Sequence, residues 1–208
     1  LSASFTEWSS DKIDLSWTAP SGPANLSYSI VTNPVTTTQT TTDTTYQYTG
    51  LDPNTLYQFS ITSISGASGN KIGGTASVSE TSGPRIPNTF SNTLSNYNTI
   101  TVNWDSASGI DKYTVSERVG QIGDWNNYDI LDTSATTYTF TNLTSNDDHE
   151  IRILPWRGGK IGIGRWLWPV TTAPDRVNNL STSSITSSSI QLTWTEPTNS
   201  TNVTYYVT

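Results

Sequence analysis

Apolar and polar residues alternate with a period of two in three short segments spread along the chain. The segments are 13–17 (IDLSW), 100–104 (ITVNW) and 190–194 (IQLTW), and each ends on a tryptophan: Trp17, Trp104 and Trp194. Strict alternation is the pattern of a strand that buries one face. The tryptophans are separated by 87 and then 90 residues, and a fixed spacing of this kind indicates tandem copies of one folding unit.

Further alternating segments follow each tryptophan in the same order. A short polar turn leads to residues 26–30 (LSYSI), 112–115 (KYTV) and 203–207 (VTYYV), and residues 45–48 (TYQY) and 137–140 (TYTF) lead to Leu51 and Leu143. β-Branched residues dominate these segments, and no stretch of useful length has the period of a helix. The sequence therefore predicts an all-β protein.

One motif between two of these segments is more specific. Leu51 to Tyr57 reads LDPNTLY, and it resembles the tyrosine corner of the fibronectin type III family. Together with the strand tryptophans and a repeat of about ninety residues without cysteine, the motif makes nearly the whole chain resemble that family. The resemblance implies tandem, immunoglobulin-like β-sandwiches, each with seven strands in two sheets.

Two proline steps mark the expected domain boundaries. Gly83-Pro84 and Ala173-Pro174 divide the chain into repeats at 1–83 and 84–173 and an incomplete third repeat at 174–208, since proline ends a strand. Such short linkers predict a stiff, end-to-end rod. We expect the third repeat to contain only its first three strands, and the chain to be a fragment or a processed product.

Composition narrows the possible partners. The 208 residues carry a formal net charge of −7, which disfavours nucleic acid because phosphates require a basic surface. Cysteine is absent, so disulfides and thiolate metal sites are excluded. No apolar run is long enough for a membrane helix. We expect no cofactor, no metal ion and no membrane insertion.

His149 is the single histidine of the chain. Beside three carboxylates it could act as a general base or a metal ligand. It also stands six residues after Leu143, as Tyr57 does after Leu51, so it occupies the tyrosine-corner position. The repeat therefore favours a structural histidine, and it predicts that His149→Tyr raises the melting temperature of the second repeat.

Catalysis has little support in the sequence. Glycoside hydrolysis needs two carboxylates that face each other across a cleft, whereas Asp147 and Asp148 are adjacent in a turn and Asp129 and Asp132 lie in a loop-like stretch. No serine lies in a Gly-x-Ser-x-Gly motif, and the one histidine already has a structural interpretation. We expect the chain not to be an enzyme.

Residues 155–169 (PWRGGKIGIGRWLWP) differ from the rest of the chain. A phosphate-binding loop would need Ser or Thr after Lys160 and a following helix, and neither is present. Lys71-Ile72-Gly73 recurs as Lys160-Ile161-Gly162, 89 residues later. We therefore interpret the glycines as the turn of a hairpin between the last two strands of each repeat.

Tryptophan and arginine are what the second repeat adds to this hairpin. Alternation from His149 predicts that Ile151 and Ile153 point into the core, and that Arg152, Leu154 and Trp156 point outward. Arg planes could stack on Trp faces as an intramolecular ladder, or the exposed side chains could contact a protein or stack on sugar rings. The candidate binding residues are Trp156, Arg157, Lys160, Arg165, Trp166, Trp168 and Trp125.

Asparagine sequons are a further candidate feature. Asn25, Asn142, Asn179, Asn199 and Asn202 each begin an Asn-x-Ser/Thr triplet, although a chain rich in these residues produces such triplets by chance.

The sequence favours a non-enzymatic structural and adhesive segment of a larger surface, filament or virion-appendage protein. It would act as a spacer and would contact other protein subunits, with carbohydrate as another partner. One alternative is an accessory region of a secreted polysaccharide-degrading enzyme, and another is a receptor ectodomain. Each places the chain outside the cell, at a cell surface or on a virion.

Overall fold

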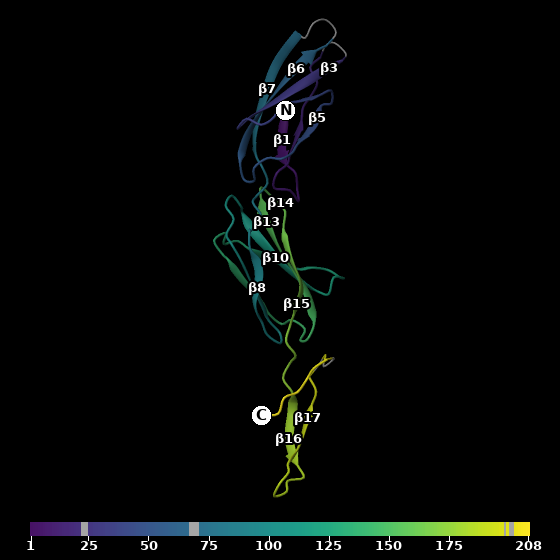
Figure 1. Cartoon of the computed structure of the whole chain (residues 1–208). Coiled ribbons are helices and arrows are strands. Elements are labelled where there is room, and N and C mark those ends of the chain that lie inside the picture. Colours follow the sequence, from purple (N-terminus) through teal and green to yellow (C-terminus); the bar gives the residue numbers. More distant parts are fainter. Residues whose placement is uncertain (22–24, 67–70, 198, 200–201) are drawn as a thin grey trace. The chain divides into compact units, whose positions relative to one another are not determined.

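The computed structural model describes residues 1–21, 25–66, 71–197, 199 and 202–208 (Figure 1). Within those ranges every regular element is a β-strand. The described residues contain no helix of the length and apolarity that a membrane crossing requires.

The first repeat is a sandwich of two antiparallel sheets whose core is formed by alternate strand residues. Ile13, Ile30 and Phe59 are fully buried in it. The three-stranded sheet has the order β1-β2-β5 and the four-stranded sheet the order β4-β3-β6-β7. The strands are β1 (Ser2–Phe5), β2 (Ile13–Ser16), β3 (Leu26–Asn33), β4 (Gln39–Thr41), β5 (Thr45–Tyr48), β6 (Leu56–Ser65) and β7 (Lys71–Thr81).

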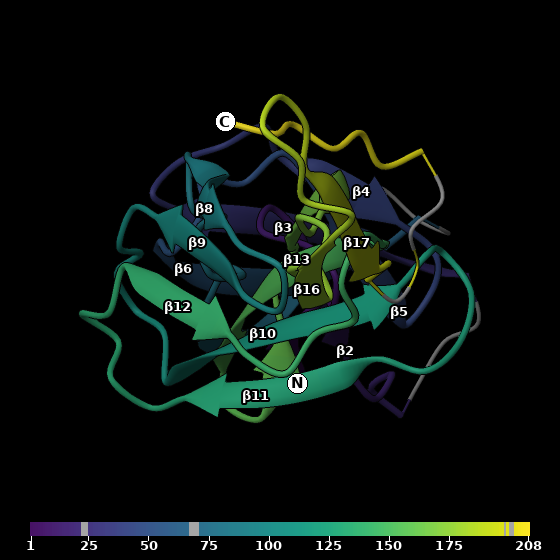
Figure 2. The same cartoon turned by 90° about the horizontal axis from the view of Figure 1, so that it is seen from below.

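The second repeat has the same plan. One sheet has the order β12-β9-β8, and the other has the order β11-β10-β13, with β14 and β15 both paired to β13. Figure 2 shows β8, β9 and β12 side by side, and β10 and β11 in the other layer. The strands are β8 (Phe90–Ser95), β9 (Ile100–Trp104), β10 (Lys112–Val119), β11 (Asn126–Ile130), β12 (Thr137–Phe140), β13 (Asp148–Arg157), β14 (Lys160–Ile161) and β15 (Arg165–Thr171). The predicted all-β sandwich fold is confirmed.

The tryptophan that recurs in each repeat packs against a tyrosine that recurs with it. The ring centroids are 5.2 Å apart for Trp17 and Tyr28, 5.6 Å for Trp104 and Tyr113, and 5.4 Å for Trp194 and Tyr205. Aromatic pairs of this geometry stabilise a core beyond their buried area. Because each repeat uses the same tryptophan–tyrosine contact, the tryptophan recurs once per repeat.

The third repeat contains β16 (Asn178–Ser183) and β17 (Gln191–Thr195), which pair with each other. The strand predicted at residues 203–207 does not form. In the first repeat the corresponding strand, β3, pairs with β6, and the described part of the third repeat supplies no strand of that kind. Alternation is therefore not enough to form this strand without a neighbour.

Backbone contacts group the chain into two compact units. The first contains Leu1–Ile86, Ala107–Lys112 and Leu154–Gly164, and the second contains Pro87–Ser106, Tyr113–Ile153 and Arg165–Thr208. The boundaries at residues 83 and 173 and the end-to-end rod stay predictions from the sequence.

Candidate functional site

The candidate site lies on the outer face of the second repeat's larger sheet. Along β13, His149, Ile151 and Ile153 are fully buried, as predicted, and Arg152 points to the opposite face. Leu154 was expected outside but is only 2% exposed. Simple alternation is therefore wrong at this residue, which is grouped with the first compact unit while the preceding residues of β13 are grouped with the second.

Two guanidinium groups contact the Trp125 ring on this face. The Cζ of Arg152 is 4.1 Å from the centre of the Trp125 ring, and the Cζ of Arg118 is 4.4 Å from it. A ring contacted by two cations makes a double cation–π contact. The arrangement resembles the ladder expected from the sequence, but its ring comes from the segment before β11 rather than from β13 or β15.

Both arginines of the stack have further partners. Arg118 donates to Glu150 over 2.7 Å and forms an ion pair with it, and Arg152 donates to Ser116 and Asn127. Burial lowers the pKa of Arg152, with the neighbouring Arg118 acting in the same direction and Glu150 against it. The charges of this face are therefore already compensated or stacked within the repeat.

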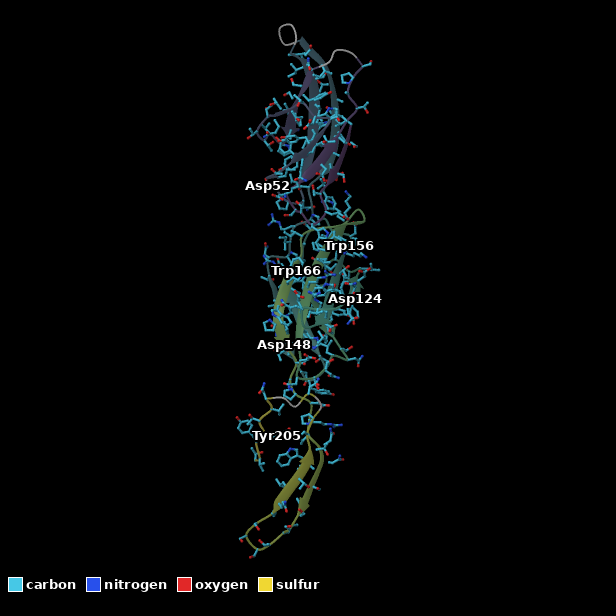
Figure 3. The ribbon with its side chains drawn as sticks, turned by 90° about the vertical axis from the view of Figure 1, so that its right-hand side faces the viewer. Asp52, Asp124, Asp148, Trp156, Trp166 and Tyr205 are labelled. Carbon is cyan, nitrogen blue, oxygen red and sulfur yellow. The ribbon has the colours of Figure 1, made fainter. Side chains whose placement is uncertain are left out.

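Two tryptophans of β15 stay open to solvent next to this stack. Trp166 is 45% exposed and Trp168 is 41% exposed, and Trp168 lies where the pairing of β15 with β13 shifts register. Trp166 is the cross-strand partner of Arg152 and is labelled in Figure 3. We call Arg118, Trp125, Arg152, Trp166 and Trp168 the tryptophan face.

The other candidate binding residues lie elsewhere. Trp156 is half-buried, with the Nζ of Lys112 4.8 Å from its ring centre. Arg157 donates to the Thr81 carbonyl, and Lys160 donates to the Phe5 carbonyl over 3.1 Å. Within the first compact unit these cations thus have local partners.

Arg165 belongs to the second compact unit and donates to the Pro87 carbonyl. Its side chain is thereby also tied to a local acceptor, although the residue is exposed.

The hairpin was predicted correctly only in part. Gly158 and Gly159 have φ values of 58° and 75°, so they do form a turn that favours glycine. Lys160 and Ile161 form β14, and residues 71–73 belong to β7. In the second repeat Lys160 and Ile161 therefore lie in a strand and Gly162 follows it, so the motif is not the turn. Residues 67–70, where the first repeat's turn would lie, are outside the described residues.

His149 and Glu117 form a buried pair in the core of the second repeat. Nδ1 of His149 is 3.0 Å from Oε1 of Glu117, and Nε2 is 3.3 Å from the Thr144 carbonyl oxygen. His149 is fully buried, and Glu117 is 3% exposed and accepts a second hydrogen bond from Asn126. A doubly protonated ring donates to both the Glu117 carboxylate and the Thr144 carbonyl, so it satisfies both contacts when Glu117 is ionised.

The pKa values of the pair move apart. Burial would lower the pKa of His149, but the hydrogen bonds to Glu117 and Thr144 and the charges of Glu117 and Asp147 raise it above its ordinary value. The hydrogen bond from His149 lowers the pKa of Glu117, Asn126 acts in the same direction, and burial opposes it. Tyr113 and Val115 alternate into the core, and continuing this alternation by two residues could have placed Glu117 in the core as well. It could not have shown that Glu117 lies beside His149.

The equivalent corner of the first repeat has the expected tyrosine. The Tyr57 hydroxyl accepts a hydrogen bond of 3.0 Å from the Asp52 backbone N–H, and Tyr57 is 3% exposed. This is the geometry of a tyrosine corner. The histidine in the second repeat fills the same position with different chemistry.

Of the four carboxylates weighed for catalysis, three accept from local hydroxyls, and Asp147 accepts from the Asp148 backbone N–H. Asp129 accepts from Thr114, Asp132 from Ser134 and Asp148 from Thr171. Among the described residues, no group of three or more His, Asp or Glu side chains lies together in a way that could hold a metal ion.

The five sequon asparagines share a backbone conformation. All are described, and their φ values lie between 54° and 69°, in the left-handed region that Asn tolerates better than most residues. Asn142 precedes Leu143 as Gly50 precedes Leu51, and Gly50 has a φ of 73°. Turn geometry therefore accounts for asparagine at these positions, and glycosylation stays a prediction.

Two packed antiparallel sheets with this strand order define a β-sandwich protein of the immunoglobulin-like class. A family model described as Fibronectin type III domain matches residues 2–78. The resemblance to this family that the sequence predicted is thereby confirmed for the first repeat.

Two curated proteins are similar over most of the chain. Exoglucanase B of Cellulomonas fimi is 25% identical over 212 residues, which covers 89% of this chain and 18% of that protein. Receptor-type tyrosine-protein phosphatase H of Homo sapiens is 30% identical over 193 residues, covering 89% of this chain and 17% of that protein. The chain spans less than a fifth of the length of these relatives.

Solved structures include fibronectin type III segments with limited similarity. A two-domain segment of chicken tenascin is 19% identical with a TM-score of 0.43, and covers 80% of this chain and 97% of its own. The FN1-FN3 domains of chicken CNTN1 are 14% identical with a TM-score of 0.44, covering 83% of this chain and 66% of that chain.

Proposed function

We propose that this chain is a non-enzymatic spacer and protein-contact segment of a larger extracellular, cell-surface or virion-surface protein, and that the tryptophan face makes the contact. The observation that carries the proposal is the exposure of two tryptophans on one strand, β15: Trp166 is 45% exposed and Trp168 is 41% exposed. Tryptophan is enriched among the residues that dominate binding energy at protein interfaces.

The surroundings of these two rings suit a contact surface. The stack of Trp125 with Arg118 and Arg152 holds the neighbouring side chains in place, so little conformational entropy is lost when a partner covers the face. The ion pair of Arg118 with Glu150 already compensates one charge. The partner is therefore expected to offer apolar pockets for the indoles rather than a strongly acidic surface.

The test is co-sedimentation of the purified chain with surface assemblies isolated from its source. The double variant Trp166→Ala, Trp168→Ala is expected to bind about tenfold or more weakly, since hot-spot residues contribute on the order of 1–2 kcal/mol each. Trp8→Ala is the matched control, because Trp8 is 48% exposed but belongs to the first repeat. Equal binding by the wild type and the double variant would refute the proposed surface.

A second candidate function is an accessory carbohydrate-binding region of a secreted polysaccharide-degrading enzyme. Two observations favour it: the exposed indole faces of Trp166 and Trp168, and similarity to Exoglucanase B over 89% of this chain. A glycan array probed with wild type and with the double variant separates the two functions. Carbohydrate binding predicts a signal that the double variant loses, and protein contact predicts no signal from either sample.

A further inference from the structure

β7 is an edge strand with an open border. It pairs with β6 on one side, and the described residues supply no strand partner on the other (Figure 1). β1 passes near it, but the backbone of β1 pairs with β2. All residues from Gly73 to Ser77 are exposed. Such a border presents backbone N–H and C=O groups to which a further strand can pair, although the Thr81 carbonyl at the end of β7 already accepts from Arg157.

The usual protections of an edge strand are missing over part of β7. A bulge at Gly73 and Gly74 faces Ser63, and from Thr75 onward the pairing with β6 is regular. Residues 75–79 (TASVS) include neither proline nor a charged side chain. The corresponding strand of the second repeat, β15, contains Pro169, which has no N–H to donate. The two repeats therefore differ in how their edges are guarded.

We propose that two copies of this chain associate by antiparallel pairing of their β7 edges, in a register centred on Ser77. Ser77 then lies opposite Ser77 of the second copy, Ala76 opposite Val78, and Thr75 opposite Ser79. Ala76 and Val78 are on the core side of the sheet, as their partners Ile61 and Phe59 are. Each cross-strand pair thus joins two hydroxyl side chains or two apolar ones.

The existing sheet shows that such hydroxyl pairs fit together. The hydroxyl oxygens of Thr62 and Thr75 are 2.7 Å apart, and those of Ser60 and Ser77 are 2.9 Å apart. Cross-strand hydroxyl pairs are among those that stabilise antiparallel strands. The proposed register would extend this pattern by one strand.

A second copy is the occupant that the segment itself favours. An antiparallel strand pair around a two-fold axis is self-complementary, and two-fold dimers are the commonest symmetric assemblies. The net charge of −7 on each chain opposes association, but in this register Glu80 falls opposite Gly74 and no two carboxylates meet. The pairing uses no residue of the tryptophan face, so either proposal can fail without the other.

Sedimentation equilibrium over a range of concentrations tests the dimer. Wild type is expected to approach twice 22.7 kDa. Ser77→Lys places two ammonium groups opposite each other and is expected to raise the dimer dissociation constant about fivefold or more. Ser60→Lys is the matched control. It also removes the Ser60–Ser77 hydroxyl pair and adds one positive charge, but it does so on β6, which is not an edge strand. A 22.7 kDa species at every concentration, or equal effects of both variants, would overturn the proposal.

Cross-linking tests the register, since the chain has no cysteine of its own. Residues directly opposite each other on antiparallel strands have Cα atoms about 4.5–5.5 Å apart, within reach of a disulfide. Ser77→Cys is therefore expected to form an interchain disulfide on mild oxidation at least tenfold faster than Ser60→Cys. Equal rates for the two variants would contradict the proposed pairing.

Discussion

At the residue scale, His149 shows how one position of a repeat can keep its place and change its chemistry. The sequence placed it at the tyrosine corner from its distance to Leu143. Its buried partner Glu117 is 32 residues away on another strand, and local periodicity carries no information on which core side chains meet. The structural role followed from the repeat, whereas the ion pair did not.

The structure reverses the expected effect of His149→Tyr. A tyrosine would leave Glu117, which is 3% exposed, without its cationic partner. Breaking a buried pair from one side costs about 3 kcal/mol or more, so the variant is expected to lower the melting temperature of the second repeat. The double variant His149→Tyr, Glu117→Gln buries no charge and should be less destabilised. A melting temperature above that of wild type would contradict this reading of the pair.

The same pair predicts a pH dependence of stability. Because folding raises the pKa of His149, its contribution is complete below the ordinary value of 6.5 and is lost as pH rises through the folded value. Because folding lowers the pKa of Glu117, its contribution is present above 4.5 and is lost as pH falls through the folded value. The pair therefore stabilises the second repeat most between these two ordinary values.

NMR titration of the imidazole measures the pKa of His149 directly, since the chain has one histidine. The pKa of His149 is expected above 6.5 in the wild type and lower in Glu117→Gln. A wild-type value below 6.5, or no change in the variant, would show that the pair does not hold the proton.

At the element scale, strands were predicted well wherever a neighbour was available. The segments at 45–48, 100–104 and 137–140 match β5, β9 and β12 in their bounds. The segment at 203–207 alternates as clearly but forms no strand, because a half-buried strand depends on partners that its own pattern does not specify. Alternation also failed at Leu154, which was expected to be exposed but is buried.

The arginine–tryptophan stack is the element-scale feature that the sequence only partly anticipated. Trp125 follows a turn-rich segment outside any strand, and only the fold brings it into contact with Arg118 on β10 and Arg152 on β13. Residue types predicted a ladder, but which ring would take part depended on the path of the loop before β11.

Trp125→Ala measures what the stack contributes to stability. Loss of two cation–π contacts at about 0.5–1 kcal/mol each should lower the free energy of unfolding by about 1–2 kcal/mol, measured by urea denaturation at low salt. Trp168→Ala removes a tryptophan ring of β15 that is 41% exposed, and it should cost less. Equal losses in the two variants would mean that the stack adds no stability beyond ordinary burial.

At the scale of the whole molecule, composition and repeat spacing were sufficient to predict the fold class. They were not sufficient to predict the function of the chain. A chain with 10 cationic and 17 anionic side chains disfavours nucleic acid, but it does not distinguish a spacer from an accessory domain. The structure narrows the candidate surface, because Arg157, Lys160 and Arg165 have local acceptors while Trp166 and Trp168 stay exposed.

Hydroxyl-radical footprinting of the chain bound to the proposed surface assembly tests the central claim most directly. Trp166, Trp168 and Trp8 are 45%, 41% and 48% exposed in the free chain, so all three should be oxidised readily before binding. On binding, the account predicts strong protection of Trp166 and Trp168 and unchanged oxidation of Trp8. A bound chain in which Trp166 and Trp168 react as fast as in the free chain would contradict it.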